Sequence, residues 1–436
     1  MSFAMTLVLI LFLILLFLGF PVLLALGLPC IVWLFMNPRI PDSVLAQNMM
    51  SYMTSFTLIG LPGFLFVGRL MNACGITDKL FNVSIATVGR FRGGLAHANA
   101  FASMLFASMS GTAIADAGGL GLVEMRMMKR AGYKLDFAAG ITAASSILGP
   151  IIPPSGAMVL IGTIAEVSVA NMFFAGIVPG VVMCGAIMIQ VALRANFTKE
   201  GRLWPKTVIP LVPALLTFLN AIPALMTFVI IMGSIYLGIS TPAEAAVMAV
   251  IYSIVLGFIY KKLTFKKLWD TLRDTGVACG PLLIIMASAS IFTWVLMREG
   301  LTFMLTNSIK GISAQYGNTI VILVILGIFL ILGCFIDSIS IVLCTAPIVF
   351  PIIRAIGVDP VQFGVVMVIA IMIGIITPPF GICNFVVASV AKLTVKEVTR
   401  ESVRYIPAMV VVLLLVMFVP DIALFFPKVL MGYVAK

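Results

Sequence analysis

The feature that most constrains this chain is a series of long apolar stretches separated by short charged segments. Hydrophobic residues make up 62% of the 436 residues, and charged residues make up only 10%. About 20 apolar residues are needed for one helical crossing of a bilayer. The stretches lie at about 3–36, 54–74, 93–125, 137–165, 170–193, 207–236, 243–260, 278–297, 318–353, 361–391 and 405–426. This pattern predicts an all-α polytopic membrane protein and leaves no room for a folded extramembrane enzyme, so we expect no enzymatic activity.

The charge of the chain is unbalanced, with 27 Lys and Arg against 16 Asp and Glu and a net charge of +11. In a membrane protein such an excess reflects basic loops held on the cytoplasmic side, so we expect no nucleic-acid partner. The seven cysteines are scattered through apolar segments without a Cys-x-x-Cys pair. They predict small buried side chains, with neither disulfides nor a transition-metal site.

The chain repeats itself when 56–160 is laid over 281–385. Identity in this window is barely above that expected from the apolar composition, but glycines and double prolines recur at matching positions. The clearest match is between the segments 149–156 and 374–381, each of which carries Gly at both ends and a central Pro-Pro. These residues determine backbone shape rather than hydrophobicity, so they indicate two structural copies.

Charge predicts how the two copies are oriented. Six basic residues flank 93–125, whereas only two flank the matching segment 318–350, so the copies are expected to face opposite sides of the membrane. The segment 93–125 is too short for two spans of about 20 residues each and long for one, which favours a re-entrant hairpin. Inverted repeats with broken helices that meet at the midplane are typical of secondary transporters. The segments 75–89 and 300–317 are predicted to be amphipathic helices at the interface, with ordinary loops as the alternative.

The predicted organisation has two repeats set among scaffold helices. Its parts are N-terminal scaffold helices (1–53), a first repeat (54–165, with an arm helix, the hairpin 93–125 and a broken helix 137–165), scaffold helices and cytoplasmic loops (166–277), a second repeat (278–391, with an arm helix, the hairpin 318–353 and a broken helix 361–391) and a C-terminal helix (392–436).

The two Gly-Pro breaks are candidate binding segments, because irregular backbone inside a membrane must be buried in protein or line a wet cavity. Proline releases a carbonyl four residues upstream, and a free carbonyl suits a hard cation such as Na⁺, whereas a half-helix N-terminus suits an anion. Two proline kinks repaired by neighbouring side chains are the alternative. The predicted cation-binding positions are Gly149, Pro150, Thr377 and Pro378, and the predicted substrate-binding positions are Pro153, Pro154, Ser155, Pro379 and Asn384.

The centres of the two hairpins carry polar residues in an apolar setting, and an ionisable residue there indicates a functional site. Thr112 of the first centre overlays Asp337 of the second. Hydroxyl, carboxylate and carbonyl oxygens at a hairpin tip would form an oxygen cage for Na⁺. Hydroxyls that satisfy helix carbonyls are the alternative, above all for Ser108 and Ser340. The candidates are Ser110, Gly111, Thr112 and Asp116 in the first hairpin and Asp337 and Ser338 in the second.

Three further polar residues lie within apolar segments. His97, the only histidine, is expected to be structural rather than a proton relay. Arg69 could neutralise an anionic substrate or extend to the membrane surface. Glu244 follows Ser-Thr-Pro-Ala, which is typical of the start of a capped helix.

At these motifs the chain resembles the large membrane subunit of the TRAP transporters, the tripartite ATP-independent periplasmic transporters of bacteria, over nearly its whole length. The motifs are 110–117, 149–155, 240–246, Asp337-Ser338 and 376–381. The chain departs from the family at Gly118-Gly119, where alanines are usual, and at Gly156-Ala157, where a bulky residue and a further proline are common.

The resemblance implies an elevator-type, Na⁺-coupled importer in the bacterial inner membrane. It implies two partners, a small four-helix membrane subunit and a periplasmic substrate-binding protein. The substrate would be an organic acid such as a C4-dicarboxylate, sialic acid or a 2-oxo acid, and membrane lipid would surround the chain.

Two rival functions remain at this stage. A self-sufficient Na⁺/dicarboxylate symporter would need no binding protein. An intramembrane aspartyl protease would use Asp116 and Asp337 as a close pair, although the repeat places Thr112 rather than Asp116 opposite Asp337.

Overall fold

A computed structural model describes residues 3–206 and 211–435 of the chain. Within these residues every regular element is a helix, which confirms the all-α prediction. Residues 1–2 of the predicted segment 1–53, residues 207–210 at the start of the apolar stretch 207–236, and residue 436 lie outside the description.

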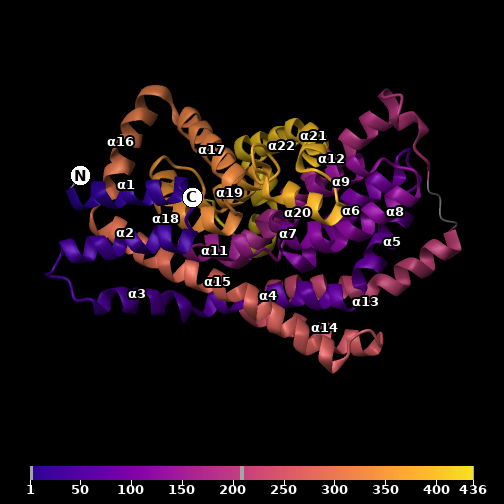
Figure 1. The fold of residues 1–436 in the computed structure, drawn as a ribbon, viewed down its shortest axis with the longest axis horizontal. Helices are drawn as coiled ribbons and strands as arrows, with labels where there is room; N and C mark the ends of the chain where they lie inside the picture. The colour runs from indigo at the N-terminus through magenta and orange to yellow at the C-terminus, as the bar shows by residue number, and fades with distance from the viewer. Residues whose placement is uncertain (1–2, 207–210, 436) are drawn as a thin grey trace.

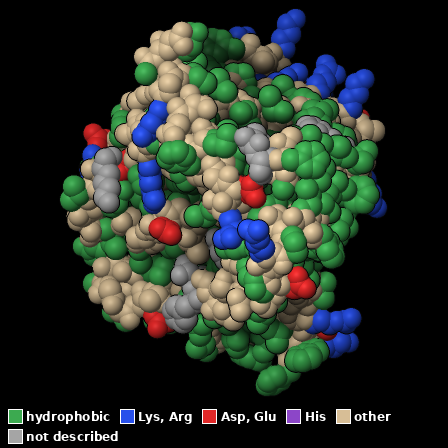
Figure 2. Space-filling model, turned by 90° about the vertical axis from the view of Figure 1, so that its left-hand side faces the viewer, with side chains coloured by type: hydrophobic (Ala, Val, Ile, Leu, Met, Phe, Trp, Pro, Cys, Tyr) green, Lys and Arg blue, Asp and Glu red, His purple; other side chains and the backbone are tan. Residues whose placement is uncertain are grey.

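Eight helices of the described residues are long and apolar enough to cross a bilayer, or nine if the bent pair α4–α5 is one span. Large hydrophobic side chains are exposed on them, including Phe197 at 77% and Val277 at 69%. Figure 2 shows such side chains spread over one face of the molecule, with charged groups scattered between them. Exposed apolar surface on this scale is typical of contact with lipid, as expected for a polytopic membrane protein.

The first repeat is a run of helices that begins with a bent pair. Its elements are α4 (Phe56–Ala73), α5 (Ile76–Val88), α6 (Gly94–Ser110), α7 (Ala113–Ala115), the π-helical turn η1 (Asp116–Leu120), α8 (Gly121–Arg130), α9 (Leu135–Ser146), α10 (Leu148–Ile151) and α11 (Gly156–Ile164). The predicted second repeat (278–391) takes in the C-terminal part of α15 (Phe265–Arg298), and α16 (Leu301–Tyr316), α17 (Asn318–Phe335), α18 (Ser338–Ala355), α19 (Pro360–Gly374) and α20 (Ile382–Ala391).

Equivalent glycines mark the same junctions in both repeats. Gly75 (φ +68°) precedes α5, and Gly300 (φ +71°) precedes α16. Gly132 and Gly357 also have positive φ, at +87° and +78°, between hairpin and broken helix. Because these conformations favour glycine, the repeat read from the sequence corresponds to a repeated chain path.

The remaining helices surround the repeats (Figure 1). They are α1 (Phe3–Phe17), α2 (Val22–Met36), α3 (Ser43–Met53), α12 (Val169–Phe197), the 3₁₀ turn η2 (Gly201–Leu203), α13 (Leu211–Tyr236), α14 (Pro242–Ile259), α21 (Val395–Ser402), the 3₁₀ turn η3 (Val403–Tyr405), α22 (Ile406–Phe418) and α23 (Pro420–Met431). In Figure 1, α3, α4, α13 and α14 lie along the lower edge, and α9 and α19–α22 lie above them. The segment 392–436, predicted as one helix, thus contains several.

The start of α14 has the predicted cap. The Thr241 hydroxyl accepts a hydrogen bond from the Glu244 amide (3.3 Å), and the Glu244 carboxylate accepts one from the Thr241 amide (2.7 Å). This reciprocal pair is a capping box. The interpretation of Glu244 as a structural residue is confirmed.

The cysteines are free thiols, and all of them are buried except Cys344, which is half-buried.

The broken helices form the centre of the fold. All 15 residues of α19 are buried, and the most apolar window of Leu135–Ile164, which contains the first break, is 89% buried. By contrast, the corresponding window of α13 is 28% buried. The first break is therefore enclosed by protein, as required for backbone with unpaired polar groups, whereas Pro378, Pro379 and Phe380 of the second break are exposed.

The two hairpins differ in length. α6 has 17 residues and is followed by broken pieces, and none of these helices is among the candidate spans. α17 and α18 have 18 residues each, and both are candidate spans. α5 bends away from α4 by 77°, a geometry suited to an interfacial helix. It stays a prediction that the hairpins are re-entrant, that the two repeats are inverted, and that α5 and α16 lie at the membrane interface.

We expect Phe91→Cys and Tyr316→Cys to react from opposite sides of the membrane, because inverted repeats place the hairpin entrances on opposite faces. Both native side chains are exposed, at 47% and 58%. Labelling with a membrane-impermeant maleimide, in intact and then permeabilised cells, measures this. The unsubstituted chain controls for its own thiols, and labelling of both positions from the same face would refute the inverted repeat.

Candidate binding cavity

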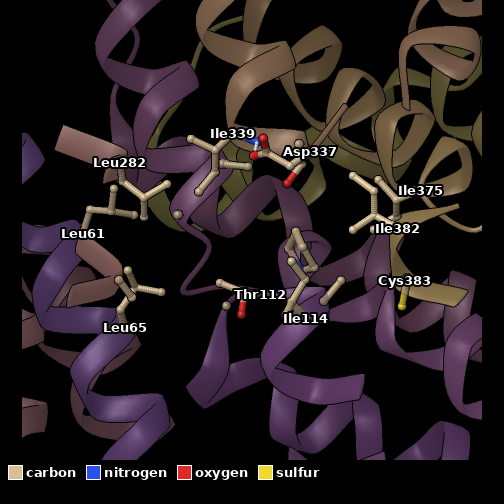
Figure 3. A pocket seen from close by; sticks show the side chains of 17 residues that line it. Leu61, Leu65, Thr112, Ile114, Leu282, Asp337, Ile339, Ile375, Ile382 and Cys383 are labelled. Atoms are coloured by element: carbon tan, nitrogen blue, oxygen red, sulfur yellow. Dashed lines mark hydrogen bonds between the residues drawn. The ribbon is translucent and has the colours of Figure 1, made fainter. Parts of the chain in front are cut away.

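Four segments that the sequence singled out meet around one cavity of about 310 Å³. Its wall includes the first hairpin tip (111–114), the first break (Pro150, Gly156 and Ala157), the second hairpin tip (337–339) and the second break (Ile375, Ile382 and Cys383). Leu61 and Leu65 of α4 and Leu282 of α15 complete one side (Figure 3). Equivalent segments of the two repeats, far apart in the chain, thus build a single site.

Thr112 and Asp337 have equivalent roles at the two hairpin tips. Thr112 is the N-cap of α7 and accepts a hydrogen bond from the Ala115 amide (3.2 Å). Asp337 is the N-cap of α18 and accepts bonds from the amides of Ile339 (3.1 Å) and Ser340 (3.2 Å). In Figure 3 they lie on opposite sides of the cavity. The overlay of these residues in the sequence therefore corresponds to a shared function as helix caps.

Three helices begin at the cavity wall. Gly156 and Ala157 are the first residues of α11, Ser338 and Ile339 those of α18, and Ile382 and Cys383 those of α20. A helix N-terminus carries partial positive charge, even where, as here, the amides of Ile339, Met158 and Cys383 donate to Asp337, Ser155 and the Ile375 carbonyl. Converging N-termini make the cavity a suitable site for an anion.

Each hairpin tip packs directly against the break of its own repeat. A Cβ on Gly111, whose φ is +61°, would collide with the carbonyl oxygen of Pro154, and one on Gly149 would lie 2.9 Å from the Thr112 carbonyl carbon. In the second repeat the Gly381 amide donates to the Cys334 carbonyl (3.3 Å). Both double-proline peptides, Pro153-Pro154 and Pro378-Pro379, are cis. Tip and break therefore form one unit in each repeat.

Five of the predicted site residues line the cavity, namely Gly111, Thr112, Pro150, Asp337 and Ser338. The others lie outside its wall: Ser110, Asp116, Gly149, Pro153, Pro154, Ser155, Thr377, Pro378, Pro379 and Asn384. Several of these are adjacent to lining residues in the chain. Arg69 and His97 do not line it either.

The predicted polar residues differ in whether their side-chain oxygens have hydrogen-bond partners. Thr377, in the second break, donates to the Ile373 carbonyl of the preceding helix α19 (2.7 Å). Asn384, fully buried, donates to the Ile376 carbonyl at the second break (2.7 Å), and its Oδ1 has no partner among the described residues. The Ser110 hydroxyl is likewise buried without a partner in the described part of the chain. Ser110 and Asn384 thus keep unused oxygens close to the two breaks.

The Ser108 and Ser340 hydroxyls were both expected to donate to helix carbonyls, and only Ser108 does so. Ser108 donates to the Leu105 carbonyl (2.5 Å), as predicted. Ser340 instead donates to the Asp337 carboxylate, so the prediction of a helix-carbonyl partner is wrong for this residue. The cause is the cap, which brings an acceptor stronger than a carbonyl within reach.

Asp116 lies in the π-helical turn η1, away from the cavity wall. It is 1% exposed, and neither carboxylate oxygen has a hydrogen-bond partner among the described residues. Because Asp337 lines the cavity and Asp116 does not, the two acids are not a shared dyad. This arrangement removes the support for a protease.

The sequence analysis missed a buried polar cluster behind Asp116. Asn99 donates to Glu124 Oε2 (2.6 Å) and to Thr142 (2.8 Å), and Ser145 donates to Asn99 (2.8 Å). Glu124 is fully buried, and its Oε1 has no partner within the described ranges. A signal was present, because Glu124 is an acid inside the apolar segment 93–125, although it lies only two residues before Arg126 in the basic flank of that segment.

A family model described as "Tripartite ATP-independent periplasmic transporter, DctM component" matches residues 9–422. The chain belongs to this family. The resemblance drawn from the motifs is thereby confirmed, and a permease rather than an enzyme is the kind of protein expected.

Relatives match the chain over nearly its whole length. The sialic acid TRAP transporter large permease protein SiaM of Vibrio cholerae is 36% identical over 424 residues, which cover 96% of this chain and 97% of SiaM. The C4-dicarboxylate TRAP transporter large permease protein DctM of the same species is 34% identical over 439 residues, 95% of each chain. The 2,3-diketo-L-gulonate TRAP transporter large permease protein YiaN of Escherichia coli is 30% identical over 408 residues, 93% and 94% of the two chains.

Two solved structures share the fold. The crystal structure of the Alcanivorax borkumensis YdaH transporter has a TM-score of 0.63 and 14% sequence identity, with 86% of each chain covered. The structure of Neisseria gonorrhoeae MtrF has a TM-score of 0.54 and 14% identity, with 86% of this chain and 84% of MtrF covered. At this identity the likeness is one of fold alone.

We expect Asn99→Ala to lower the stability of the purified chain by about 2 kcal/mol, because losing the amide leaves buried acceptors unsatisfied at roughly 1–3 kcal/mol each. Thermal unfolding in detergent measures the effect. Asn196→Ala is the matched control, since Asn196 is exposed and donates only to the Ala192 carbonyl of its own helix, and it should shift stability by less than about 0.5 kcal/mol. Equal shifts in the two variants would contradict a stabilising role for the Asn99 cluster.

Proposed function

We propose that this chain is the large permease subunit of a Na⁺-coupled importer of organic acids in a bacterial inner membrane. The observation that carries the proposal is the cavity at which the N-termini of α11, α18 and α20 converge between the two hairpin tips. In this proposal a periplasmic binding protein delivers the substrate, and a small four-helix membrane subunit completes the permease.

The substrate class follows from the charge of the cavity and from the relatives. Helix N-termini favour a carboxylate. The relatives are named for sialic acid, C4-dicarboxylates and 2,3-diketo-L-gulonate. An organic acid similar to these compounds is consistent with the family membership and with the converging N-termini of α11, α18 and α20.

Na⁺ coupling is supported by the sign of the side-chain charge in the cavity. Asp337 is the only charged side chain among the described residues that line it, and a carboxylate repels an acidic substrate. A cation bound between them would remove this repulsion and couple the two binding events. Oxygen ligands for Na⁺ would come from the hairpin tips and breaks, at the positions predicted for cation binding in the sequence analysis.

An elevator mechanism is supported by how the hairpins and breaks pack. Tip and break contact each other directly in both repeats, so the two hairpins and broken helices would move as one body. α4 and α14 pack closely through Gly60 and Gly63, where an added Cβ would lie 3.1 Å and 2.9 Å from Ala243 and Ala246 atoms. Close small-residue packing suits a rigid contact in a membrane, and α4 also packs closely on the first hairpin, where a Cβ on Gly68 would lie 2.8 Å from the Ser110 Cα.

The first test is uptake by liposomes that contain this chain and its small subunit. We expect accumulation of a labelled organic acid only with an inward Na⁺ gradient and the cognate binding protein, because both are needed in the proposed cycle. A K⁺ gradient of equal size is the control. Na⁺-driven uptake without the binding protein would establish the self-sufficient symporter instead, and binding-protein-dependent uptake indifferent to Na⁺ would refute the coupling.

A second test separates the charge of Asp337 from its role as a cap. Asparagine also caps helices well, so Asp337→Asn keeps the start of α18 but removes the negative charge. We expect the Na⁺ concentration for half-maximal uptake to rise about tenfold, because losing a charged ligand costs roughly 1.5–3 kcal/mol.

Asp359→Asn is the matched control for this substitution. Asp359 caps α19 in the same way, accepting bonds from the Val361 and Gln362 amides at 2.9 and 3.0 Å, and it lies outside the cavity wall. Its variant should leave the Na⁺ dependence unchanged. If Asp337→Asn also leaves it unchanged, Asp337 is a cap only and the cation site must be assigned elsewhere.

A further inference from the structure

A second cavity, of about 540 Å³, lies where the start of α6 meets the last turns of α12. Its wall includes Arg90, Arg92, His97 and Lys206 together with apolar side chains of α12 such as Ile189. No acidic residue is among the described residues that line it. The cavity is therefore a basic recess at the end of an apolar span.

The three cations of this recess have no acidic partner. Within the described part of the chain, Arg90, Arg92 and Lys206 make no ion pair, and all three are exposed. The nearby Arg194 differs, because it pairs with Glu200 (3.4 Å) and with Glu401. Arg90 lies over the Phe91 ring, 5.6 Å from its centroid, which orients it without neutralising it. The recess thus presents uncompensated positive charge.

His97 contributes a buried donor to the same recess. Its ring is 4% exposed, and neither nitrogen has a hydrogen-bond partner among the described residues. A neutral imidazole always carries one N–H donor, and a buried donor is normally paired. The ring packs against Phe91 at 5.7 Å between centroids. An acceptor brought by a ligand would satisfy this donor.

An apolar stripe leads from the recess along α12. Ile189 lines the recess, and Val181, eight residues earlier, lies on the same face of the helix toward the middle of the span. They are 62% and 53% exposed. A ligand that combines an acceptor-rich anionic group with long hydrocarbon chains would fill the recess and cover this stripe.

We propose that this recess binds the phosphate headgroup of an anionic phospholipid, whose acyl chains lie along the stripe on α12. The basic cluster belongs to the side that the positive-inside rule assigns to the cytoplasm. Basic pockets between membrane helices on that side suit lipid headgroups. The stripe favours a lipid over a free phosphate, because a free anion would leave it uncovered. This inference does not depend on the transported substrate.

The test is titration of the full, delipidated chain with phosphatidylglycerol or phosphatidylcholine of equal chain length, with bound lipid counted by native mass spectrometry. Phosphatidylglycerol is expected to bind about a hundredfold more tightly, since each of the three basic residues near the anionic headgroup contributes about a fivefold factor. The double variant Arg90→Gln/Arg92→Gln should lose most of this preference. Inorganic phosphate in large excess over the lipid, the free-anion competitor, should not displace it.

The matched control is Lys129→Gln/Arg130→Gln, which removes two exposed charges on α8 outside the recess and should change the affinity less than about twofold. Lys206→Gln provides a second variant if the double variant does not elute as a single species. Equal binding of the two lipids, equal losses in recess and control variants, or displacement by inorganic phosphate would each overturn the proposal.

Discussion

The structure depends on one constraint, which is that a peptide group without a hydrogen-bond partner cannot face lipid. Two Gly-Pro breaks interrupt helices in this chain, and each leaves such groups. The first break is enclosed by protein, since every residue of 149–156 is buried, whereas the second follows the fully buried α19 but leaves Pro378, Pro379 and Phe380 exposed. The continuous helix α13 is mostly exposed, whereas the longer α12 and α15 are each 56% buried over their most apolar window. The constraint thus accounts for the burial of the first break.

The same constraint provides the chemistry of the cavity. Ending one helix and starting another inside the protein gives unpaired amides and carbonyls, which can bind ions that a continuous helix could not. Thr112 and Asp337, at matching positions of the repeat, occupy the same place as N-caps and face the same cavity. Thr112 is neutral and Asp337 is acidic, so the two hairpin tips present different charges to the cavity. This asymmetry is suited to binding two different ions, an anionic substrate and a cation.

Close contacts surround the first hairpin at its glycines. At Gly119, where alanine is usual in the family, an added Cβ would lie 3.1 Å from the Asn72 side-chain amide nitrogen of α4. Gly121, two residues on, lies against Thr142, a partner of Asn99 in the buried cluster. The tight packing of the first hairpin thus depends on small residues on one side and on the Asn99 and Glu124 hydrogen bonds on the other.

The sequence by itself determined the helical membrane class, the capped start of α14 and the motifs that identify the family, because hydropathy, glycine, proline and capping residues act over short distances in the chain. It also named the four segments that meet at the cavity. Only the tertiary structure decided which residues line that cavity, that Asp116 does not, and that Glu124 is buried beside Asn99. These depend on contacts such as Asn99 with Thr142, 43 residues apart, and no local pattern encodes which distant side chains will meet.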